Sequence, residues 1–369
     1  MWVSDSYENI ERQARAHMNR GDYQEALAGY HRLAQRLNTL KPAVLERRPE
    51  LSRLHVLCQA QQATILHWQG ELEQALDLYK ELTEKDPANR DLWHQAMGMV
   101  MIDMGQTEAG LDELRARAVA SPGDAIAWLT IAQECEALGR HDEAEENFER
   151  AMNNATTPEA KNEVFLAVFD YHRAQGQVDE AMEAWNKAWQ DRDSHPDYIF
   201  PIYQMMWENG DFDSAREYLN KERNPLRKGF YRGWFAFEQQ DLETAHSQWR
   251  KVAKMAPLKY EEGHDAWAEA ALRSDISSQE IISVLQAVQQ AGAMTIRGLI
   301  LLAVAEARHG HVDHALSVLA AAQNIGLRSR PRQEKLVLSS WQLVDDLLSD
   351  EAAKNQMRPF FETEETEES

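Results

Sequence analysis

Three histidines that lie close together are the side chains of this sequence whose type and spacing come nearest to a metal site. His309, His311 and His314 fall within six residues, and imidazole nitrogens are common ligands of zinc. A tetrahedral zinc site needs four ligands, and no fourth ligand lies nearby in the sequence. The segment Gly139 to Ala144 has the same spacing of glycine and alanine, with ordinary polar residues between them. We therefore interpret the histidines as part of a turn between two helices and expect no bound metal.

No other set of residues has the spacing of a catalytic or cofactor-binding motif. The sequence contains no phosphate-binding or dinucleotide-binding glycine loop, no zinc-protease motif and no nucleophile elbow. Cys58 and Cys135 are far apart, and we interpret both as small residues of a helical core. We expect no catalytic residue and no cofactor, and we expect that the protein is not an enzyme.

The charge of the chain limits the partners that it can bind. It has 61 acidic and 39 basic residues and a formal net charge of −22. The negative electrostatic field of such a chain repels nucleic-acid phosphates and anionic lipids, and it favours protein partners. The start of the sequence has no signal-peptide pattern, the most apolar run (Gly298 to Ala305) is too short to cross a membrane, and two cysteines suit a reducing compartment. We expect a cytoplasmic protein that binds neither DNA nor membranes.

The segment from Ala125 to Ala151 contains two helical patterns joined by a glycine, Gly139. Each pattern has apolar residues at helical spacing, small ones where two helices would approach and large ones beside them. These residues are Trp128, Ile131, Ala132 and Cys135 in the first helix, and Ala144, Phe148 and Ala151 in the second. The order of tryptophan, small residue, glycine, alanine, aromatic residue and alanine resembles that of the tetratricopeptide repeat (TPR) family.

The turn glycine recurs along the chain at a nearly constant interval, and this recurrence predicts where the repeats and domains lie. It appears at Gly70, Gly105, Gly139, Gly176 and Gly210, with intervals of 35, 34, 37 and 34 residues. From Gln240 onward the repeats lose parts of the pattern, and Gly310 restores it. We expect an N-terminal hairpin with long helices and a loop (1–55), a regular array (56–225), degenerate repeats (226–329), a capping helix (330–350) and an acidic disordered tail (351–369).

The resemblance implies the fold and the general position of a binding site. The expected fold is all-α, a right-handed α-solenoid of about nine TPR-like hairpins plus a C-terminal capping helix. In this family the first helix of each pair lines a concave groove that holds a partner segment. Chaperone-binding members hold a carboxylate there with a basic clamp, but the matching positions here are Glu11, Arg15, Ala60 and Thr64, so chaperone-tail binding is not expected.

The groove positions become aromatic in the second half of the chain. Aligned on the repeat, the groove positions hold Phe200, Gln204 and Trp207 in one unit, and Phe230, Trp234 and Phe237 in the next. A group of bases accompanies them, namely Arg223, Arg227, Lys228 and Arg232. Aromatic residues with arginine are good anchors for a peptide, in particular an acidic one. We predict that Arg227 and the six groove residues bind the partner.

Two alternatives remain open from the sequence. The helix that holds Phe230, Trp234 and Phe237 is apolar nearly all round, so these residues could instead belong to the core. The function that we predict is a scaffold or adaptor that binds a partner peptide or helix in the groove. The alternatives are a regulator whose bound effector responds to peptide binding, and an RNA-binding helical-repeat protein, which the net charge disfavours.

Overall fold

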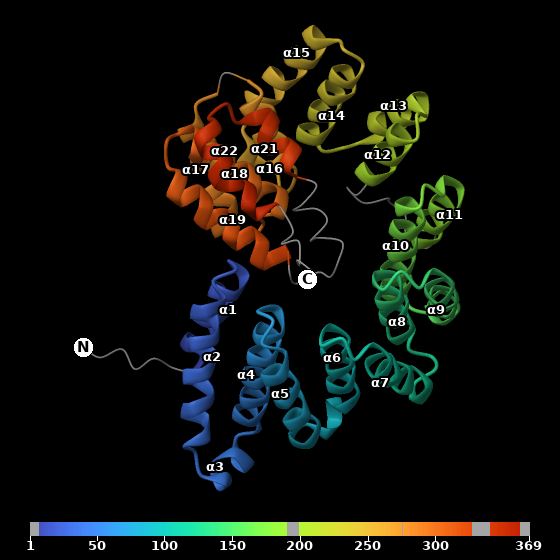
Figure 1. The fold of residues 1–369 in the computed structure, drawn as a ribbon, viewed down its shortest axis with the longest axis vertical. Helices are drawn as coiled ribbons and strands as arrows, with labels where there is room; N and C mark the ends of the chain where they lie inside the picture. The colour runs from blue at the N-terminus through green and yellow to red at the C-terminus, as the bar shows by residue number, and fades with distance from the viewer. Residues whose placement is uncertain (1–6, 190–198, 275, 327–339, 362–369) are drawn as a thin grey trace, which may run out of the picture. The chain divides into compact units, whose positions relative to one another are not determined.

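The computed structural model describes residues 7–189, 199–274, 276–326 and 340–361. These residues form helices and no strand. Residues 1–171 with 183–191 form one compact unit (unit 1), and residues 172–182 with 192–369 form another (unit 2). The all-α fold of paired helices is therefore the one expected (Figure 1).

Unit 1 consists of consecutive helices that pack in pairs, each pair against the next. The last helix pair crosses the boundary, because the end of α10 and the start of α11 belong to unit 2. The helices are α1 (Tyr7–Asn19), α2 (Tyr23–Asn38), α3 (Pro42–Arg47), α4 (Pro49–Trp68), α5 (Leu72–Lys85), α6 (Arg90–Asp103), α7 (Thr107–Ala120), α8 (Ala125–Ala137), α9 (His141–Asn154), α10 (Pro158–Ala174) and α11 (Val178–Trp189), with a 3-10 turn η1 (Pro87–Asn89).

Unit 2 continues the pairing and adds two short helices at its C-terminal end. Its helices are α12 (Phe200–Glu208), α13 (Phe212–Lys221), α14 (Pro225–Glu238), α15 (Leu242–Ala253), α16 (His264–Leu272), α17 (Ser278–Gln290), α18 (Ile296–Arg308), α19 (Val312–Gly326), α21 (Trp341–Leu347) and α22 (Glu351–Met357), with 3-10 turns η2 (Pro257–Lys259) and η3 (Arg358–Phe360).

Pair α8–α9 shows how the repeat residues produce the hairpin. Ala132 and Ala144 are completely buried, so the two helix backbones approach closely there. Phe148 fills the space beside them and is 2% exposed. Gly139 has φ 70° at the turn, a left-handed conformation that glycine adopts without a steric penalty.

The end of unit 2 differs from the expected cap and tail. The expected capping helix spans 330–350; residues 330–339 lie outside the described part, and α21 occupies 341–347. Within the expected disordered segment 351–369, α22 and η3 are folded, and Ala353, Met357 and Phe361 are buried in the core of unit 2. Ala353 and Met357 are one helical turn apart and give α22 an apolar side, and Phe361 follows η3. The acidic stretch Glu362–Ser369 lies outside the described residues.

The turn of pair α14–α15 holds a glutamine where most other hairpin turns hold glycine. Gln240 has φ 63°, the one positive value among the described non-glycine residues. A side chain in this conformation costs about 1–2 kcal/mol. Part of that cost is offset because glutamine has less conformational freedom to lose on folding than glycine has.

We predict that Gln240→Gly raises the free energy of unfolding by about 0.5–1 kcal/mol, measured by urea denaturation. The matched control is Gly139→Gln, since a Cβ atom at Gly139 would meet no atom within 4 Å and only backbone strain would change. That variant should lose about 1 kcal/mol. If Gln240→Gly and the unmodified protein have the same free energy of unfolding, the prediction that Gln240 is strained is wrong.

Candidate functional site

The first helices of consecutive pairs in unit 2 lie side by side and form one surface. Helix α14 packs on α16, and α16 packs on α18. Helix α12 joins α14 through the side-chain amide of Gln204, which donates a 2.7 Å hydrogen bond to the hydroxyl of Tyr231. We call this row of α12, α14, α16 and α18 the first-helix surface. It contains all seven residues that the sequence predicts as groove residues.

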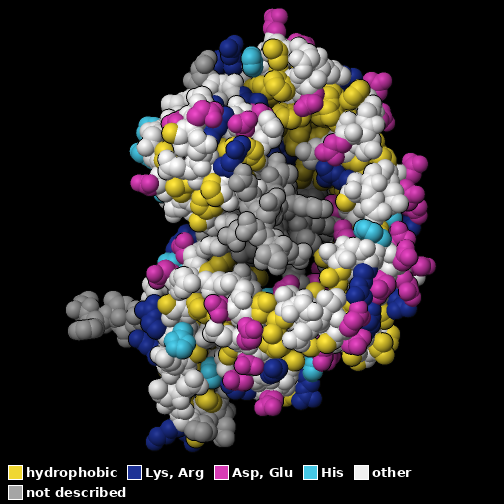
Figure 2. Space-filling view, viewed as in Figure 1, with side chains coloured by type: hydrophobic (Ala, Val, Ile, Leu, Met, Phe, Trp, Pro, Cys, Tyr) yellow, Lys and Arg dark blue, Asp and Glu magenta, His cyan; other side chains and the backbone are white. Residues whose placement is uncertain are grey.

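Helix α14 is apolar on several sides because three helices surround it. Tyr231 and Phe235 face α12, and the ring of Phe235 stacks on that of Trp207 at 3.8 Å between centroids. On the side toward α15, Gly233 lies so close to Trp249 that a Cβ atom would come within 2.5 Å of its indole nitrogen. In Figure 2 hydrophobic side chains gather over α14. The aromatic composition of this helix is therefore explained largely by packing.

Phe230 belongs to the core and not to an open groove. It is 2% exposed, and its backbone carbonyl accepts a hydrogen bond from the indole nitrogen of Trp249. Beside it, the guanidinium of Arg273 lies over the rings of Trp234 and Phe237 at 5.1 and 5.6 Å. This corrects the prediction for Phe230. The reason is that Trp249 of the second helix α15 lies against Phe230, with 6.5 Å between the two ring centroids.

Arg227 is likewise not an open groove residue, because its charge is already paired. Its side chain is 9% exposed and bonds the carboxylates of Glu222 at 3.3 Å and Glu262 at 2.8 Å. Burial opposes the charge, but the two carboxylates more than compensate and raise the pKa of the guanidinium above its ordinary value. This corrects the prediction that Arg227 binds an acidic partner.

Two of the neighbouring bases also have partners within the unit. The amino group of Lys228 donates to the backbone carbonyls of Asn220 and Glu222 at 2.6 and 3.2 Å. Arg232 donates to the side-chain oxygen of Asn220 at 2.9 Å. The group of bases predicted beside the groove therefore bonds largely to residues of its own unit.

Five predicted residues remain partly exposed on the first-helix surface, and they are Phe200, Gln204, Trp207, Trp234 and Phe237. They offer aromatic rings and one amide. Near the end of α12, the exposed Phe212 extends the aromatic area, with its ring 4.6 Å from that of Trp207. A surface of half-buried aromatic rings is typical of sites that anchor apolar side chains of a partner.

Three further residues on the helices of the first-helix surface were not predicted from the sequence, namely Tyr231, Glu269 and Arg297. Tyr231 is partly exposed, and burial raises the pKa of its hydroxyl. Glu269 is fully buried and pairs with Arg297, whose side chain is 43% exposed. A single glutamate in the otherwise apolar stretch of α16 was the signal that could have identified this ion pair, since an unpaired buried carboxylate is costly.

Comparison with known families identifies the repeat. A model described as tetratricopeptide repeat matches residues 125–155, the hairpin formed by α8 and α9. The chain therefore contains a tetratricopeptide repeat (TPR). No curated protein matches it in sequence.

Solved structures that resemble this TPR protein do so in fold. The crystal structure of yeast Tom70 is 13% identical, with a TM-score of 0.51, and the match covers 97% of this chain and 66% of Tom70. The structure of pilF from Pseudomonas aeruginosa is 18% identical, with a TM-score of 0.40, and covers 55% of this chain and 92% of its own. A TPR protein from Parabacteroides merdae is 17% identical, with a TM-score of 0.39, over 67% and 92% of the two chains.

The histidines of the TPR protein lie at the turn of pair α18–α19. Gly310 has φ 89° there. The Nδ1 atoms of His311 and His314 lie 2.9 and 2.8 Å from the two carboxylate oxygens of Glu306, which is 2% exposed. Within the described residues, no group of three or more histidine, cysteine and acidic side chains is arranged to hold a metal ion.

In the described part of the chain, the cysteines are not reactive thiolates and no helix could span a membrane. Cys58 and Cys135 are buried free thiols. Burial raises the pKa of Cys58 to about 12 and that of Cys135 to about 11, so neither is a reactive thiolate at neutral pH. None of the described helices is both long enough and apolar enough to cross a membrane.

Proposed function

We propose that this TPR protein is a scaffold that binds a segment of a partner protein on the first-helix surface of unit 2. The observation that supports this most directly is the set of partly exposed aromatic rings on neighbouring first helices, above all Trp234 and Phe200. Repeat proteins use such surfaces for extended contacts with a partner. The buried free thiols support action in a reducing compartment such as the cytoplasm.

We further propose that apolar side chains, and not acidic ones, anchor the partner to this surface. Arg227 and Arg297 are engaged by carboxylates of their own unit. The rings of Phe200 and Trp234 offer apolar contact area, and Gln204 and Tyr231 offer polar groups that a peptide backbone can bond. A short segment with one or two large apolar residues fits this chemistry.

The test places the photo-reactive amino acid p-benzoylphenylalanine at Gln204, on the first-helix surface, and in a second protein at Glu243, which is exposed on the second helix α15. Cross-linking in the native cell should join a discrete partner segment to position 204 and not to position 243. Mass spectrometry identifies the segment, which is then synthesised. Cross-linking to both positions alike, or to RNA in place of protein, would contradict the proposal.

Trp234→Ala should weaken the binding of the synthesised segment by about 2 kcal/mol, close to a thirtyfold rise in Kd, as for a truncated aromatic hot spot. Because Trp234 is partly buried against Arg273, the variant should also lose about 1–3 kcal/mol of stability. Glu243→Ala is the matched control and should change neither quantity. Unchanged affinity of a folded Trp234→Ala protein, measured by calorimetry, would exclude Trp234 from the binding surface.

A further inference from the structure

Four basic side chains follow one another closely where α15 ends and η2 begins. They are Arg250, Lys251, Lys254 and Lys259, and all four are exposed. Over residues 244–260 the sequence has no aspartate or glutamate, whereas the whole chain has 61 acidic against 39 basic residues. The segment is therefore a local reversal of charge on a strongly acidic protein. We call these four residues the α15 basic patch.

The charges of the α15 basic patch are not used by the described part of the protein. None of the four side chains forms a hydrogen bond, an ion pair or a ring contact with a described residue. Most other described bases of unit 2 bond a carboxylate or a carbonyl of their own unit. Examples are Arg227, Lys228, Arg297, Arg308 and Lys354.

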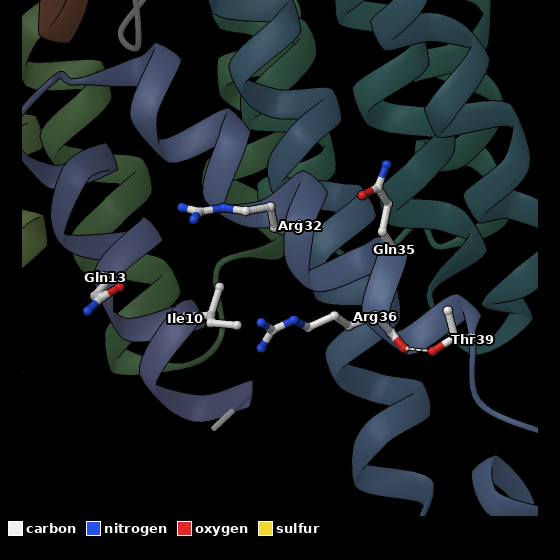
Figure 3. Close-up of a pocket in the computed structure, with 6 residues that line it drawn as sticks. All are labelled: Ile10, Gln13, Arg32, Gln35, Arg36 and Thr39. Atoms are coloured by element: carbon white, nitrogen blue, oxygen red, sulfur yellow. Dashed lines mark hydrogen bonds between the residues drawn. The ribbon is translucent and has the colours of Figure 1, made fainter. Parts of the chain in front are cut away.

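The arginines of the cleft between α1 and α2 in unit 1 differ from the patch in this respect. This cleft is lined by Arg32 and Arg36 (Figure 3). Arg32 donates a 3.4 Å hydrogen bond to the backbone carbonyl of Ala28, and the carbonyl of Arg36 accepts one of 2.7 Å from Thr39. The cleft therefore does not offer a group of unused cations, and the α15 basic patch does.

The position of the patch at a helix end explains only part of it. Arg250 and Lys251 lie in the last turn of α15, where a base gains about 0.3–1 kcal/mol from the helix dipole. Lys259 lies beyond the helix, in η2, where this effect has faded. Solubility does not require the four bases either, because acidic residues supply it more effectively and the chain has many of them.

An exposed leucine lies among the bases. Leu258 of η2 is 57% exposed and stands between Lys254 and Lys259 in the sequence. The neighbouring Pro257 is buried, and η2 packs on α16 and α17, so the turn is fixed to unit 2 while Leu258 stays outside the core. A fixed apolar side chain beside unpaired bases can anchor an apolar residue of a partner.

We propose that the α15 basic patch binds a short acidic segment of a partner protein, with carboxylates on Arg250 and Lys254 and one large apolar side chain against Leu258. Arg250 and Lys254 are one helical turn apart, about 6 Å along the helix axis. Alternate residues of an extended chain are about 6.5 Å apart, so two glutamates separated by one residue reach both bases. Arginine and lysine without internal partners keep all their donors for these carboxylates.

The surroundings of the patch favour a short protein segment over a nucleic acid or a membrane. Asp241 and Glu243 precede the patch, Glu261 and Glu262 follow it, and all four acids are exposed. A phosphate polymer or an anionic lipid surface extends beyond the patch and is repelled by these acids and by the net charge of the chain. A segment of a few residues lies on the bases alone, and its apolar residue uses Leu258.

The test measures the fluorescence anisotropy of a rhodamine-labelled octapeptide, Ser-Gly-Glu-Glu-Glu-Glu-Leu-Gly, with the full-length protein at 50 mM salt, where screening is weak. Binding should be at least tenfold weaker for the same peptide with glutamine in place of every glutamate. It should also weaken at least tenfold in the Arg250→Glu/Lys254→Glu variant. The matched control is Arg47→Glu/Arg53→Glu, which makes the same change of net charge at two exposed positions of unit 1 and should bind within twofold of the unmodified protein.

A second pair of variants tests the apolar contact. Leu258→Ser should weaken binding of the glutamate peptide at least fivefold. Leu242→Ser is its control, because Leu242 is 47% exposed at the other end of α15, and it should bind within twofold of the unmodified protein. Equal effects of the two leucine variants would show that Leu258 makes no contact with the segment.

Three results would overturn the proposal. They are equal binding of the glutamate and glutamine peptides, equal weakening by the two charge-reversal variants, and tighter binding of an eight-nucleotide oligouridylate or of phosphatidylserine vesicles than of the peptide. If the Arg250→Glu/Lys254→Glu protein does not fold by circular dichroism, Arg250→Gln/Lys254→Gln replaces it and should weaken binding at least fivefold.

The α15 basic patch and the first-helix surface are tested independently, because they share no residue. Failure of the cross-linking at Gln204 would leave the patch unaffected. The cross-linking control at Glu243 lies about 10 Å along the helix axis from Arg250. It also lies beside Asp241, so the acids there repel an acidic segment from that position.

Discussion

Replacement of Glu269 by alanine is expected to lower the free energy of unfolding by about 3–5 kcal/mol. Its carboxylate is fully buried in α16 and bonds Arg273 at 3.0 Å as well as Arg297. Arg273 is itself only 9% exposed, so removal of the carboxylate leaves a buried guanidinium whose remaining carboxylate, that of Asp346, is 3.9 Å away. Chemical denaturation followed by circular dichroism measures the loss.

Glu262→Ala is the control for this prediction. Glu262 also bonds a buried arginine, Arg227, but its own side chain is 56% exposed and Arg227 keeps its second carboxylate, Glu222. The expected loss is below about 1 kcal/mol, as for other ion pairs that include an exposed group.

A double replacement separates lost pairing from lost packing. In Glu269→Leu/Arg273→Met both buried charges are gone, so this protein should be more stable than Glu269→Ala. If the double variant is instead the less stable of the two, the contacts of Arg273 with the rings of Trp234, Phe237 and Trp249 are its main contribution.

The second large effect concerns Glu134 of α8, which is 5% exposed. Burial raises the pKa of its carboxyl from 4.5 to about 7. The folded protein therefore binds a proton at pH values where the unfolded chain has released it. The free energy of unfolding then falls as the pH rises from about 4.5 to about 7, and it stays lower above that range.

Glu134→Gln should remove this dependence, because glutamine carries no charge at any pH. The variant should be more stable than the unmodified protein by about 2–3 kcal/mol at pH 8.5, and the difference should nearly vanish at pH 4.5. Urea denaturation at both pH values measures it. Glu149→Gln, at an exposed position of α9, should show little difference at either pH. A stability gain for Glu134→Gln that is the same at both pH values would attribute the effect to packing.

The acids of 351–369 lie mostly in 362–369, whereas residues 351–361, which include α22 and η3, hold one acidic residue and two basic ones. An average over the segment hides the regular spacing of Ala353, Met357 and Phe361, which are buried on unit 2. Spacing at helical period is the better predictor, because a helix needs only one apolar side in order to pack.

The first-helix surface shows what the sequence could not decide. The pattern identified α12 and α14 as helices with aromatic residues at the groove positions. Whether Phe230 faces a groove depends on Trp249 of α15, against which it packs. The exposure of Trp234 depends on Arg273, just beyond α16. Whether Arg227 is available to a partner depends on Glu262, in the segment between α15 and α16.

The sequence by itself determined that this is an all-helical TPR protein, because the residues that define a hairpin contact one another within about 30 positions. Ala132 packs with Ala144, and Gly139 provides the turn between them. Only the tertiary structure decided which aromatic and basic residues are exposed, because that depends on contacts between different hairpins. The pairing of Arg227 with Glu262 and the contact of Arg273 with Trp234 are such contacts.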